Sequence, residues 1–266
     1  MSANGQSHFT LWQQFTRREI ESRHRGSMLG LVWTVLNPLL EFAIYAIVFG
    51  VIFGGRYGVA PDETAATYAL GVFLSLCMFR LAAETLGASP SIIVGQANLV
   101  KKVVFPLHIL PLATLGGIIF RSSISLGLFG IALLTFGPPL NANAFWFPLV
   151  LAPLLIGCLG GAWLLSALGV FLRDLTQITG PASMVMLYSS AIFYSQKKIE
   201  THSATAWQIL RWNPLLHLVE DSRRVLLWGM SPSIGSLLYA WIFALGLLAV
   251  GWLAFRRLRP AFADVL

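Results

Sequence analysis

Four charged residues stand inside otherwise apolar stretches of this 266-residue chain, namely Glu41, Arg80, Glu84 and Arg121. Burying a charge away from water is costly, so such groups pair with one another or face a water-filled path. Arg80 and Glu84 are four residues apart, and we expect them to pair on one helix face. Arg121 has no partner on its own stretch, so we expect it to meet Glu41 or to face a polar pathway.

Motifs for covalent chemistry are lacking from the sequence. It contains no G-x-x-x-x-G-K-[ST], no H-E-x-x-H and no G-x-S-x-G, and its five histidines are scattered. His217 and Glu220 are one helical turn apart, but a metal needs at least a third ligand. We therefore predict no catalytic residue, no metal site and no cofactor in this chain. An intramembrane enzyme that uses His217 or Glu220 remains a weaker alternative.

The elements that position these residues follow from composition. Hydrophobic residues make up 56% of the chain and charged residues 11%, against about 25% charged in a typical soluble domain. A membrane-crossing helix needs about 20 apolar residues. The predicted fold is an all-α integral membrane protein, residues 1–266 forming one transmembrane domain. Its six predicted spans are 33–54, 66–86, 107–135, 146–172, 178–195 and 233–255.

Charge outside the spans predicts orientation. Ten Lys and Arg residues fall on the side of both termini and six on the opposite side, so both termini are predicted to be cytoplasmic. The net charge of +7 favours membrane lipids or an anionic lipid substrate as partners, and nucleic acid is not expected to be one. Cys77 and Cys158 both fall inside predicted spans, so no disulfide framework is expected.

The N-terminal segment 1–32 is predicted to be a helix lying in the membrane interface. Its aromatic residues Phe9, Trp12 and Phe15 fall near one stripe, which is typical of an interfacial helix. Arginines follow them closely, at Arg17, Arg18, Arg23 and Arg25. The segment serves either as a topology anchor alone or as a contact for a lipid phosphate.

Residues 91–104, between Pro90 and Pro106, are predicted to form one short amphipathic helix. Ile92, Leu99 and Val103 are among its apolar residues, and Gln96, Asn98, Lys101 and Lys102 among its polar ones. Such a helix either docks into a groove on a soluble partner or lies on lipid headgroups.

Residues 196–232 are too amphipathic for a plain loop. Ala204–Trp212 and Pro214–Trp228 are predicted as two short helices, because proline suits the first helical position. The second would have an apolar face with Leu215 and Leu218 and a charged face with Glu220, Asp221, Arg223 and Arg224. The pair is either a surface-lying hairpin or a re-entrant one. Nearby aromatic residues form an interfacial belt or line a carbohydrate path; these are Tyr188, Phe193, Tyr194, Trp207 and Trp212.

The order of these pieces resembles the membrane permease of polysaccharide-exporting ABC transporters, a family that exports O-antigen, teichoic acid and capsular polysaccharide. The likeness spans nearly the whole chain. The spacing of all the matching motifs taken together is more specific than any one of them. The matching residues are Arg17-Arg18-Glu19-Ile20, Arg23, Ser27-Met28-Leu29-Gly30, Trp33, Asn37-Pro38, Asn98-Leu99-Val100-Lys101-Lys102-Val103-Val104-Phe105-Pro106, Phe171-Leu172-Arg173-Asp174, Trp212-Asn213-Pro214-Leu215 and Arg223.

The resemblance implies a homodimer with a channel between protomers, above a separate ATPase dimer that binds ATP and Mg²⁺. It implies that residues 91–104 are the coupling helix seated in that ATPase, through Ile92, Gln96, Asn98, Lys101 and Lys102, with Arg173 and Asp174 as a second contact. It places Arg17, Arg18, Arg23 and Arg25 near the pyrophosphate of an undecaprenyl-linked glycan. It makes 196–232 an external gate-like hairpin, and the channel or gate candidates are Arg121, Tyr188, Phe193, Tyr194, Trp207 and Trp212.

Together with the resemblance, the sequence thus predicts an inner-membrane permease for a lipid-linked polysaccharide, and the cargo it favours is O-antigen. The alternatives are an exporter of drugs or lipids with the same fold, an intramembrane enzyme that modifies glycans or lipids, and a non-enzymatic scaffold.

Overall fold

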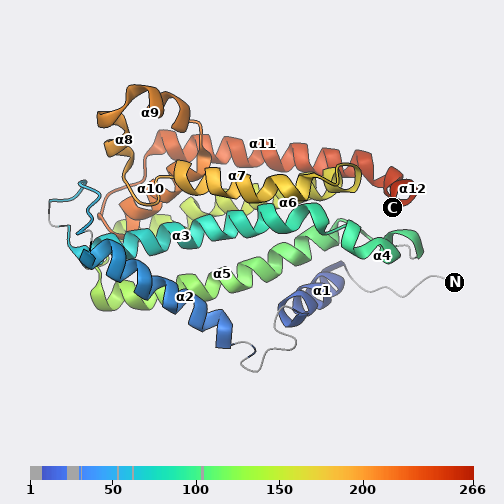
Figure 1. Ribbon diagram of the computed structural model, residues 1–266, viewed down its shortest axis with the longest axis horizontal. Coiled ribbons are helices and arrows are strands. Elements are labelled where there is room, and N and C mark those ends of the chain that lie inside the picture. The colour runs from blue at the N-terminus through green and yellow to red at the C-terminus, as the bar shows by residue number, and fades with distance from the viewer. Residues whose placement is uncertain (1–7, 23–29, 31, 53, 62, 103–104) are drawn as a thin grey trace.

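The chain is all-α in a computed structural model that describes residues 8–22, 30, 32–52, 54–61, 63–102 and 105–266. Helices and loops make up these residues, with no strand among them. The long helices run roughly along the longest axis of the molecule (Figure 1). They are α1 (His8–Ser22), α2 (Val32–Tyr45) continued by a π-helix (Ala46–Ile52), α3 (Ala65–Ala88), α5 (Ile109–Phe136), α6 (Phe147–Phe171), α7 (Leu175–Ser189) and α11 (Ile234–Leu258). The short ones are α4 (Ala97–Lys102), α8 (Gln196–His202), α9 (Ala204–Leu210), α10 (Pro214–Leu226) and α12 (Phe262–Val265).

Five of the six predicted spans are confirmed as helices long and apolar enough to cross a membrane. They are Val32–Ile52, Ala65–Ser91, Ile109–Phe136, Ala142–Phe171 and Ile234–Val265. The predicted span 178–195 is wrong in its bounds, because α7 has 15 residues and is only about 22 Å long. The helix ends at Ser189, and Ala191 has a φ of 52°, a left-handed conformation that stops a helix.

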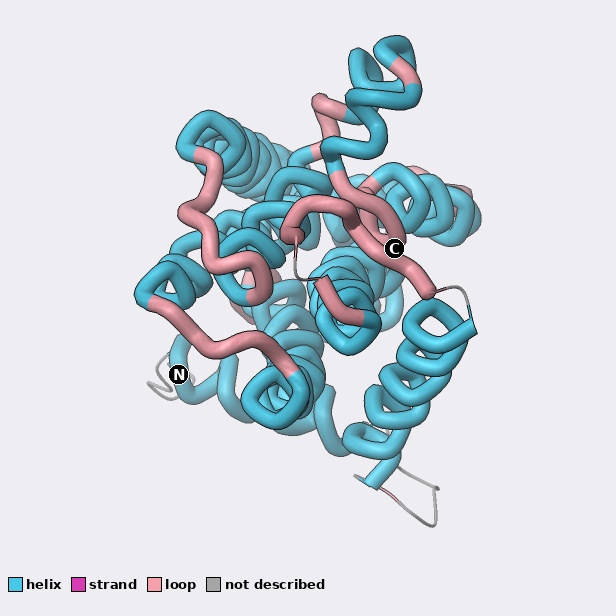
Figure 2. Tube along the Cα trace, turned by 90° about the vertical axis from the view of Figure 1, so that its left-hand side faces the viewer, coloured by secondary structure: helices cyan, strands magenta, loops and turns pink. Residues whose placement is uncertain are grey.

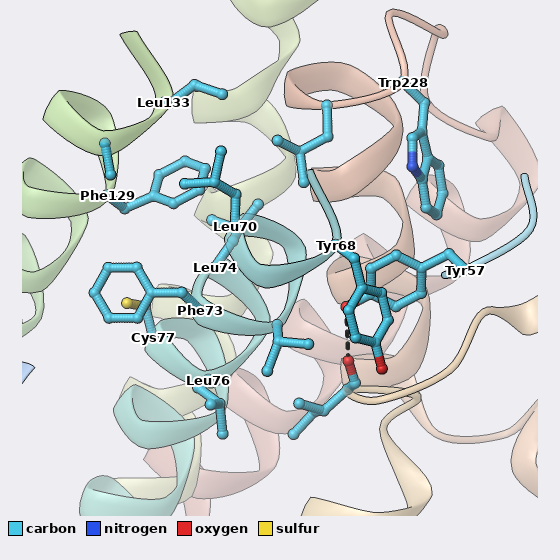
Figure 3. Packing of buried hydrophobic residues seen from close by; sticks show 14 residues of the cluster. Tyr57, Tyr68, Leu70, Phe73, Leu74, Leu76, Cys77, Phe129, Leu133 and Trp228 are labelled. Atoms are coloured by element: carbon cyan, nitrogen blue, oxygen red, sulfur yellow. Dashed lines mark hydrogen bonds between the residues drawn. The ribbon is translucent and has the colours of Figure 1, made fainter. Parts of the chain in front are cut away.

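Helix α3 is the centre of the bundle. Thr64 caps its first turn by accepting a hydrogen bond from the backbone N–H of Thr67 at 3.1 Å. Its apolar residues are buried on nearly all sides, as expected for a helix surrounded by other helices. In Figure 3, Phe73 and Leu74 of α3 lie with Phe129 of α5 in one apolar cluster. The charged residues of α3 are therefore held by a rigid support.

Helices α6 and α11 cross at a point where both carry glycine. A Cβ atom on Gly251 would lie 2.1 Å from the carbonyl oxygen of Gly160, closer than any side chain allows. Small residues at such a crossing let two membrane helices approach backbone to backbone. This close crossing joins α11 firmly to α6.

The two ends of the bundle differ. Helices α1, α4 and α12 gather at one end, called here the α4 end, and α8 and α9 project at the other, called the α9 end (Figure 1). Seen along the bundle, α8 and α9 stand away from the other helices (Figure 2). The described segments that the charge count predicts on one side of the membrane are thus brought to one end, the α4 end.

Candidate functional site

The four intramembrane charges form two ion pairs, but with different partners from those predicted. Arg80 of α3 pairs with Glu41 of α2. The Nη2 and Nε atoms of Arg121, on α5, lie 2.8 and 3.3 Å from Oε2 of Glu84, on α3. The expected pairing of Arg80 with Glu84 is therefore wrong, as is that of Arg121 with Glu41. The reason is that α3 lies between α2 and α5, so each of its two charges faces a different neighbouring helix.

A polar cavity of about 110 Å³ lies beside these pairs. Trp33 and Asn37 of α2 and Ser122 and Ser125 of α5 line it together with Arg80, Glu84 and Arg121. The Nη1 atom of Arg121 is buried, and no described residue accepts a hydrogen bond from it. Guanidinium, carboxylate, hydroxyl and amide groups around one cavity can hydrogen-bond a polar solute from several directions. Arg121 thus borders a polar cavity, and its place in a polar pathway stays a prediction.

The N-terminal helix α1 lies against α5, and its described arginines have different surroundings. The indole of Trp12 donates a hydrogen bond to the carbonyl of Leu112 at 3.2 Å. Arg17 is exposed and pairs with Glu21 at 2.8 Å. Arg18 lines a cavity of about 300 Å³. Predicted site residues Arg23 and Arg25 lie outside the described residues.

The cavity beside Arg18 joins α1 to the predicted coupling segment. Ile92, Gly95 and Gln96 form its opposite wall. A displacement of the coupling segment would therefore change the surroundings of Arg18. This contact between two predicted site elements could not be derived from their distance in the sequence.

The segment 91–104 is not one helix. It consists of two 3₁₀ turns, Ser89–Ser91 and Val94–Gln96, followed by α4. Pro90 lacks a backbone N–H, and Gly95 has low helix propensity, so a continuous α-helix is disfavoured. The side chain of Lys102 and residues 103–104 lie outside the description.

The predicted coupling segment is held to the bundle on one side and open on the other. Ile93 is fully buried, in a cluster with Ala167 of α6 and Phe255 of α11. A Cβ on Gly169 of α6 would lie 2.1 Å from the carbonyl oxygen of Pro90, so the two backbones touch. The predicted contact residues Asn98 and Lys101 are exposed, whereas Ile92 and Gln96 are half-buried.

Arg173 and Asp174 form the exposed turn between α6 and α7. The carbonyl oxygen of Arg173 accepts a hydrogen bond from Thr176 at 3.1 Å. The turn and α4 lie at the same end of the bundle (Figure 1). Both predicted contacts with a soluble partner are thus presented in one direction.

At the α9 end, α10 lies inside the bundle rather than on its surface. It packs between α3, α6 and α11, while α8 and α9 remain outside. Of the residues on the predicted charged face, Glu220, Asp221 and Arg223 are buried and Arg224 is half-buried. The region also contains α8, which was not predicted; Ser195 caps it by accepting from the N–H of Lys198.

Arg223 is fully buried and joins α10 to the residues that follow α7. Its Nη1 donates to the carbonyl of Ala191 at 2.8 Å, and its Nη2 donates to Oε2 of Glu220 at 2.5 Å. Its guanidinium lies 4.2 Å from the ring centroid of Tyr57, a cation–π contact. A buried charge with this many partners fixes the base from which α8 and α9 project.

Tyr57 and Glu63 extend this arrangement into the loop before α3. The hydroxyl of Tyr57 donates to the carbonyl of Ile192 at 2.9 Å, the dashed line in Figure 3. Glu63 accepts the backbone N–H groups of Tyr57 and Gly58, each at 2.8 Å. Burial raises the pKa of Tyr57, so it stays a hydrogen-bond donor at neutral pH. Sequence reasoning missed both residues.

The five aromatic residues predicted for a path have different surroundings. Phe193 stacks on Phe49 at 4.9 Å between ring centroids. Trp207 and Trp212 meet His217 and Tyr239 edge-on. The side chain of Tyr194 donates its hydroxyl to the carbonyl of Tyr188, which is itself exposed. Tyr188 and Trp212 are the members open to the surroundings.

His217 and Glu220 are each engaged elsewhere. A ring nitrogen of His217 lies 2.7 Å from the carbonyl oxygen of Arg211. Glu220 accepts from Arg223 and from the N–H of Gln196. The described part of the chain holds no group of three metal-ligating side chains.

Asp221 is buried in α10, which is not among the membrane-crossing helices. Burial raises its pKa to about 6, although Oδ1 accepts a hydrogen bond from the N–H of Ser233 at 2.8 Å and Arg224 lies nearby. Its Oδ2 has no hydrogen-bond partner among the described residues. The carboxyl group therefore titrates just below neutral pH.

Comparison with known proteins gives a consistent result. Residues 10–227 match the family described as ABC-2 type transporter. The chain is 28% identical over 264 residues to the O-antigen export system permease protein RfbA of Klebsiella pneumoniae, covering 97% of this chain and 95% of that one. It is 25% identical over 209 residues to the protein of the same name from Myxococcus xanthus, covering 79% of this chain and 77% of that one.

Proposed function

The chain belongs to the ABC-2 type transporter family, and from this premise we propose that it is the permease of an exporter for a lipid-linked polysaccharide. The cargo proposed is an undecaprenyl-pyrophosphate-linked O-antigen, moved across the cytoplasmic (inner) membrane with both termini in the cytoplasm. The supporting observation is similarity to O-antigen export permeases over 97% of the chain. The chain acts without chemistry of its own.

The driving force in this proposal comes from a separate ATPase dimer that binds ATP and Mg²⁺. Asn98 and Lys101 are exposed at the α4 end, and the Arg173–Asp174 turn is exposed at the same end. These residues, with Ile92, Gln96 and Lys102, are the proposed contacts. Because Pro90 touches Gly169, a push on the segment is passed directly to α6.

Two copies of the chain enclose the channel in this proposal. The arginines of the N-terminal segment receive the pyrophosphate, since a guanidinium can hold a phosphate through two parallel hydrogen bonds. Arg17 is exposed for such a contact, and Arg18, Arg23 and Arg25 complete the set. The polar cavity beside Arg121 and the exposed aromatic residues Tyr188 and Trp212 are the proposed contacts for the sugar chain.

An exporter of lipids is the second candidate. It is favoured by an apolar cavity of about 370 Å³ between α3, α6, α7, α10 and α11, in which Leu164 and Phe243 are among the lining residues. A cavity of this character suits a hydrocarbon chain rather than a sugar. The same cavity could hold the lipid part of a lipid-linked glycan, so cargo identity must be measured directly.

Deleting the gene in its native host tests the proposal. We expect surface polysaccharide to be lost and lipid-linked glycan to accumulate inside, and both defects to be reversed by the intact chain. We also expect an ATPase with a nucleotide-binding P-loop to co-purify in mild detergent. An unchanged amount of surface polysaccharide together with altered export of free lipid would favour the second candidate. If the chain purified without any ATPase even after cross-linking, both candidates would be contradicted.

A further inference from the structure

A basic cavity lies between the coupling segment and the C-terminal helices. It has a volume of about 350 Å³, within the range of small-molecule sites. Arg256, at the end of α11, and Arg259, in the 3₁₀ turn before α12, line it. Val100, Phe105, Leu107, Pro260 and Ala263 form the rest of its wall. The cavity is therefore basic on one side and apolar on the other.

The two arginines are available to a ligand. Neither guanidinium forms an ion pair or a hydrogen bond with a described residue, and both side chains belong to exposed residues. The lining contains no acidic residue, although the exposed Asp264 follows Ala263 in the chain. Two unpaired guanidinium groups at one cavity favour a phosphate, which each can bind through two hydrogen bonds.

The position of the cavity along the bundle matches that of lipid headgroups. Trp252 of α11 packs on Trp163 of α6 with ring centroids 4.9 Å apart, and His108 meets it edge-on. Tryptophan side chains gather where the hydrocarbon of a membrane meets water. Arg256 lies four residues beyond Trp252, about 6 Å further along the helix. The cavity thus lies just outside the aromatic level, where phosphates lie.

The cavity also belongs to the coupling segment. Val100 is on α4 itself, and the ring of Phe105 packs at a tilt against that of Phe15 of α1, with centroids 5.1 Å apart. Phe262 of α12 does not line the cavity, but it is fully buried in the apolar cluster against which Val100 and Phe105 pack. Whatever fills the cavity therefore touches both α4 and the C-terminal helices that support it.

We propose that this cavity binds the phosphate headgroup of an anionic phospholipid and so holds the coupling segment against the C-terminal helices. Arg256 and Arg259 bind the phosphate, and Phe105, Leu107 and Val100 contact the glycerol and first methylene groups. The choice of a lipid over an acidic protein surface follows from the apolar wall and from the headgroup level of the cavity. The proposal does not depend on the exported cargo.

The test measures lipid binding by native mass spectrometry on the full-length chain purified in mild detergent. The probes are phosphatidylglycerol, phosphatidylcholine and inorganic phosphate. The variants are Arg256→Gln/Arg259→Gln and the control Arg257→Gln, since Arg257 is exposed and adjacent but does not line the cavity. A basic residue near an anionic lipid surface contributes about fivefold in affinity, so the double variant should lose roughly 25-fold.

We expect phosphatidylglycerol to bind equally well to the wild type and to Arg257→Gln, and to bind weakly to the double variant. Phosphatidylcholine should bind weakly to all three proteins. The melting temperature in lipid-free detergent shows whether the double variant folds; if it does not, Arg256→Lys/Arg259→Lys replaces it and should bind with intermediate affinity. Equal binding of phosphatidylglycerol by all variants would overturn the proposal. The proposal would also be overturned if inorganic phosphate bound with the same affinity as phosphatidylglycerol. It would likewise be overturned if the double variant bound lipid as the wild type does but lost a co-purifying protein.

Discussion

The guanidinium of Arg121 on α5 lies 2.8 Å from the carboxylate of Glu84 on α3. Arg80, one helical turn before Glu84, is drawn instead to Glu41 on α2. Helix α3 is thus linked by charge to a helix on either side of it, next to a polar cavity. Movement of α2 or α5 must break one of these pairs, and Arg80 and Glu84 are close enough along α3 to pair with each other when that happens.

Glu84→Gln should destabilise the protein. It leaves the mostly buried guanidinium of Arg121 without its carboxylate. Removing one partner of a fully buried pair costs about 3–5 kcal/mol, and we expect somewhat less here because this pair is partly exposed. The melting temperature in detergent measures the effect. Glu21→Gln is the matched control: it breaks the exposed pair with Arg17 and should cost less than about 0.5 kcal/mol. Equal melting temperatures for the two variants would refute a structural role for the Arg121 pair.

Arg223→Lys should loosen the α9 end without unfolding the bundle. Lysine keeps the charge but cannot reach the carbonyl of Ala191, Glu220 and the Tyr57 ring together. We expect a loss of about 2–3 kcal/mol in stability and faster amide hydrogen exchange in α8 and α9. Arg224→Lys, altering a partly exposed neighbour, serves as the control. Exchange rates that do not differ between the two variants would exclude Arg223 as the support of these helices.

Asp221→Asn should remove part of the pH dependence of stability. The pKa of Asp221 is raised from its ordinary value of 3.8 to about 6, so the folded protein binds this proton more tightly than the unfolded one. The tighter binding of this proton adds about 1–3 kcal/mol to the free energy of unfolding. This stabilisation is fully present below about pH 4 and is lost as pH rises through 6.

The measurement for Asp221 is the difference in melting temperature between wild type and variant from pH 4 to pH 7. Asparagine retains an oxygen for the N–H of Ser233 and cannot ionise, so the variant should gain relative stability as pH rises. Asp174→Asn changes an exposed residue and should leave the profile unaltered. A difference that stays constant across this range would show that Asp221 keeps its charge in the fold.

Much of the fold could be predicted from the sequence because the apolar stretches are long and because proline marks where a helix begins. Pro214 begins α10 as predicted, and five spans fall close to their predicted bounds. The partners of Arg80 and Arg121 could not be predicted, because spacing along one helix says nothing about which neighbouring helix faces it. The burial of Arg223 was missed for the same reason: the carbonyl groups that receive it lie about 30 residues away in the chain.

Lys101→Glu is the change that tests the coupling segment most directly. Lys101 is exposed on α4 while Ile93 and Pro90 hold the segment to the bundle, so reversing its charge alters the outer surface without disturbing packing. If α4 docks in an ATPase, juxtaposing like charges there should weaken assembly roughly tenfold or more. Export of glycan should fall with ATPase co-purification, while the melting temperature of the permease stays unchanged.

Lys197→Glu makes the same reversal at the α9 end, where Lys197 is also exposed, and should leave assembly and export intact. If Lys101→Glu assembles and exports as well as Lys197→Glu does, α4 is not the contact with the ATPase, and the Arg173–Asp174 turn becomes the contact to test at the α4 end.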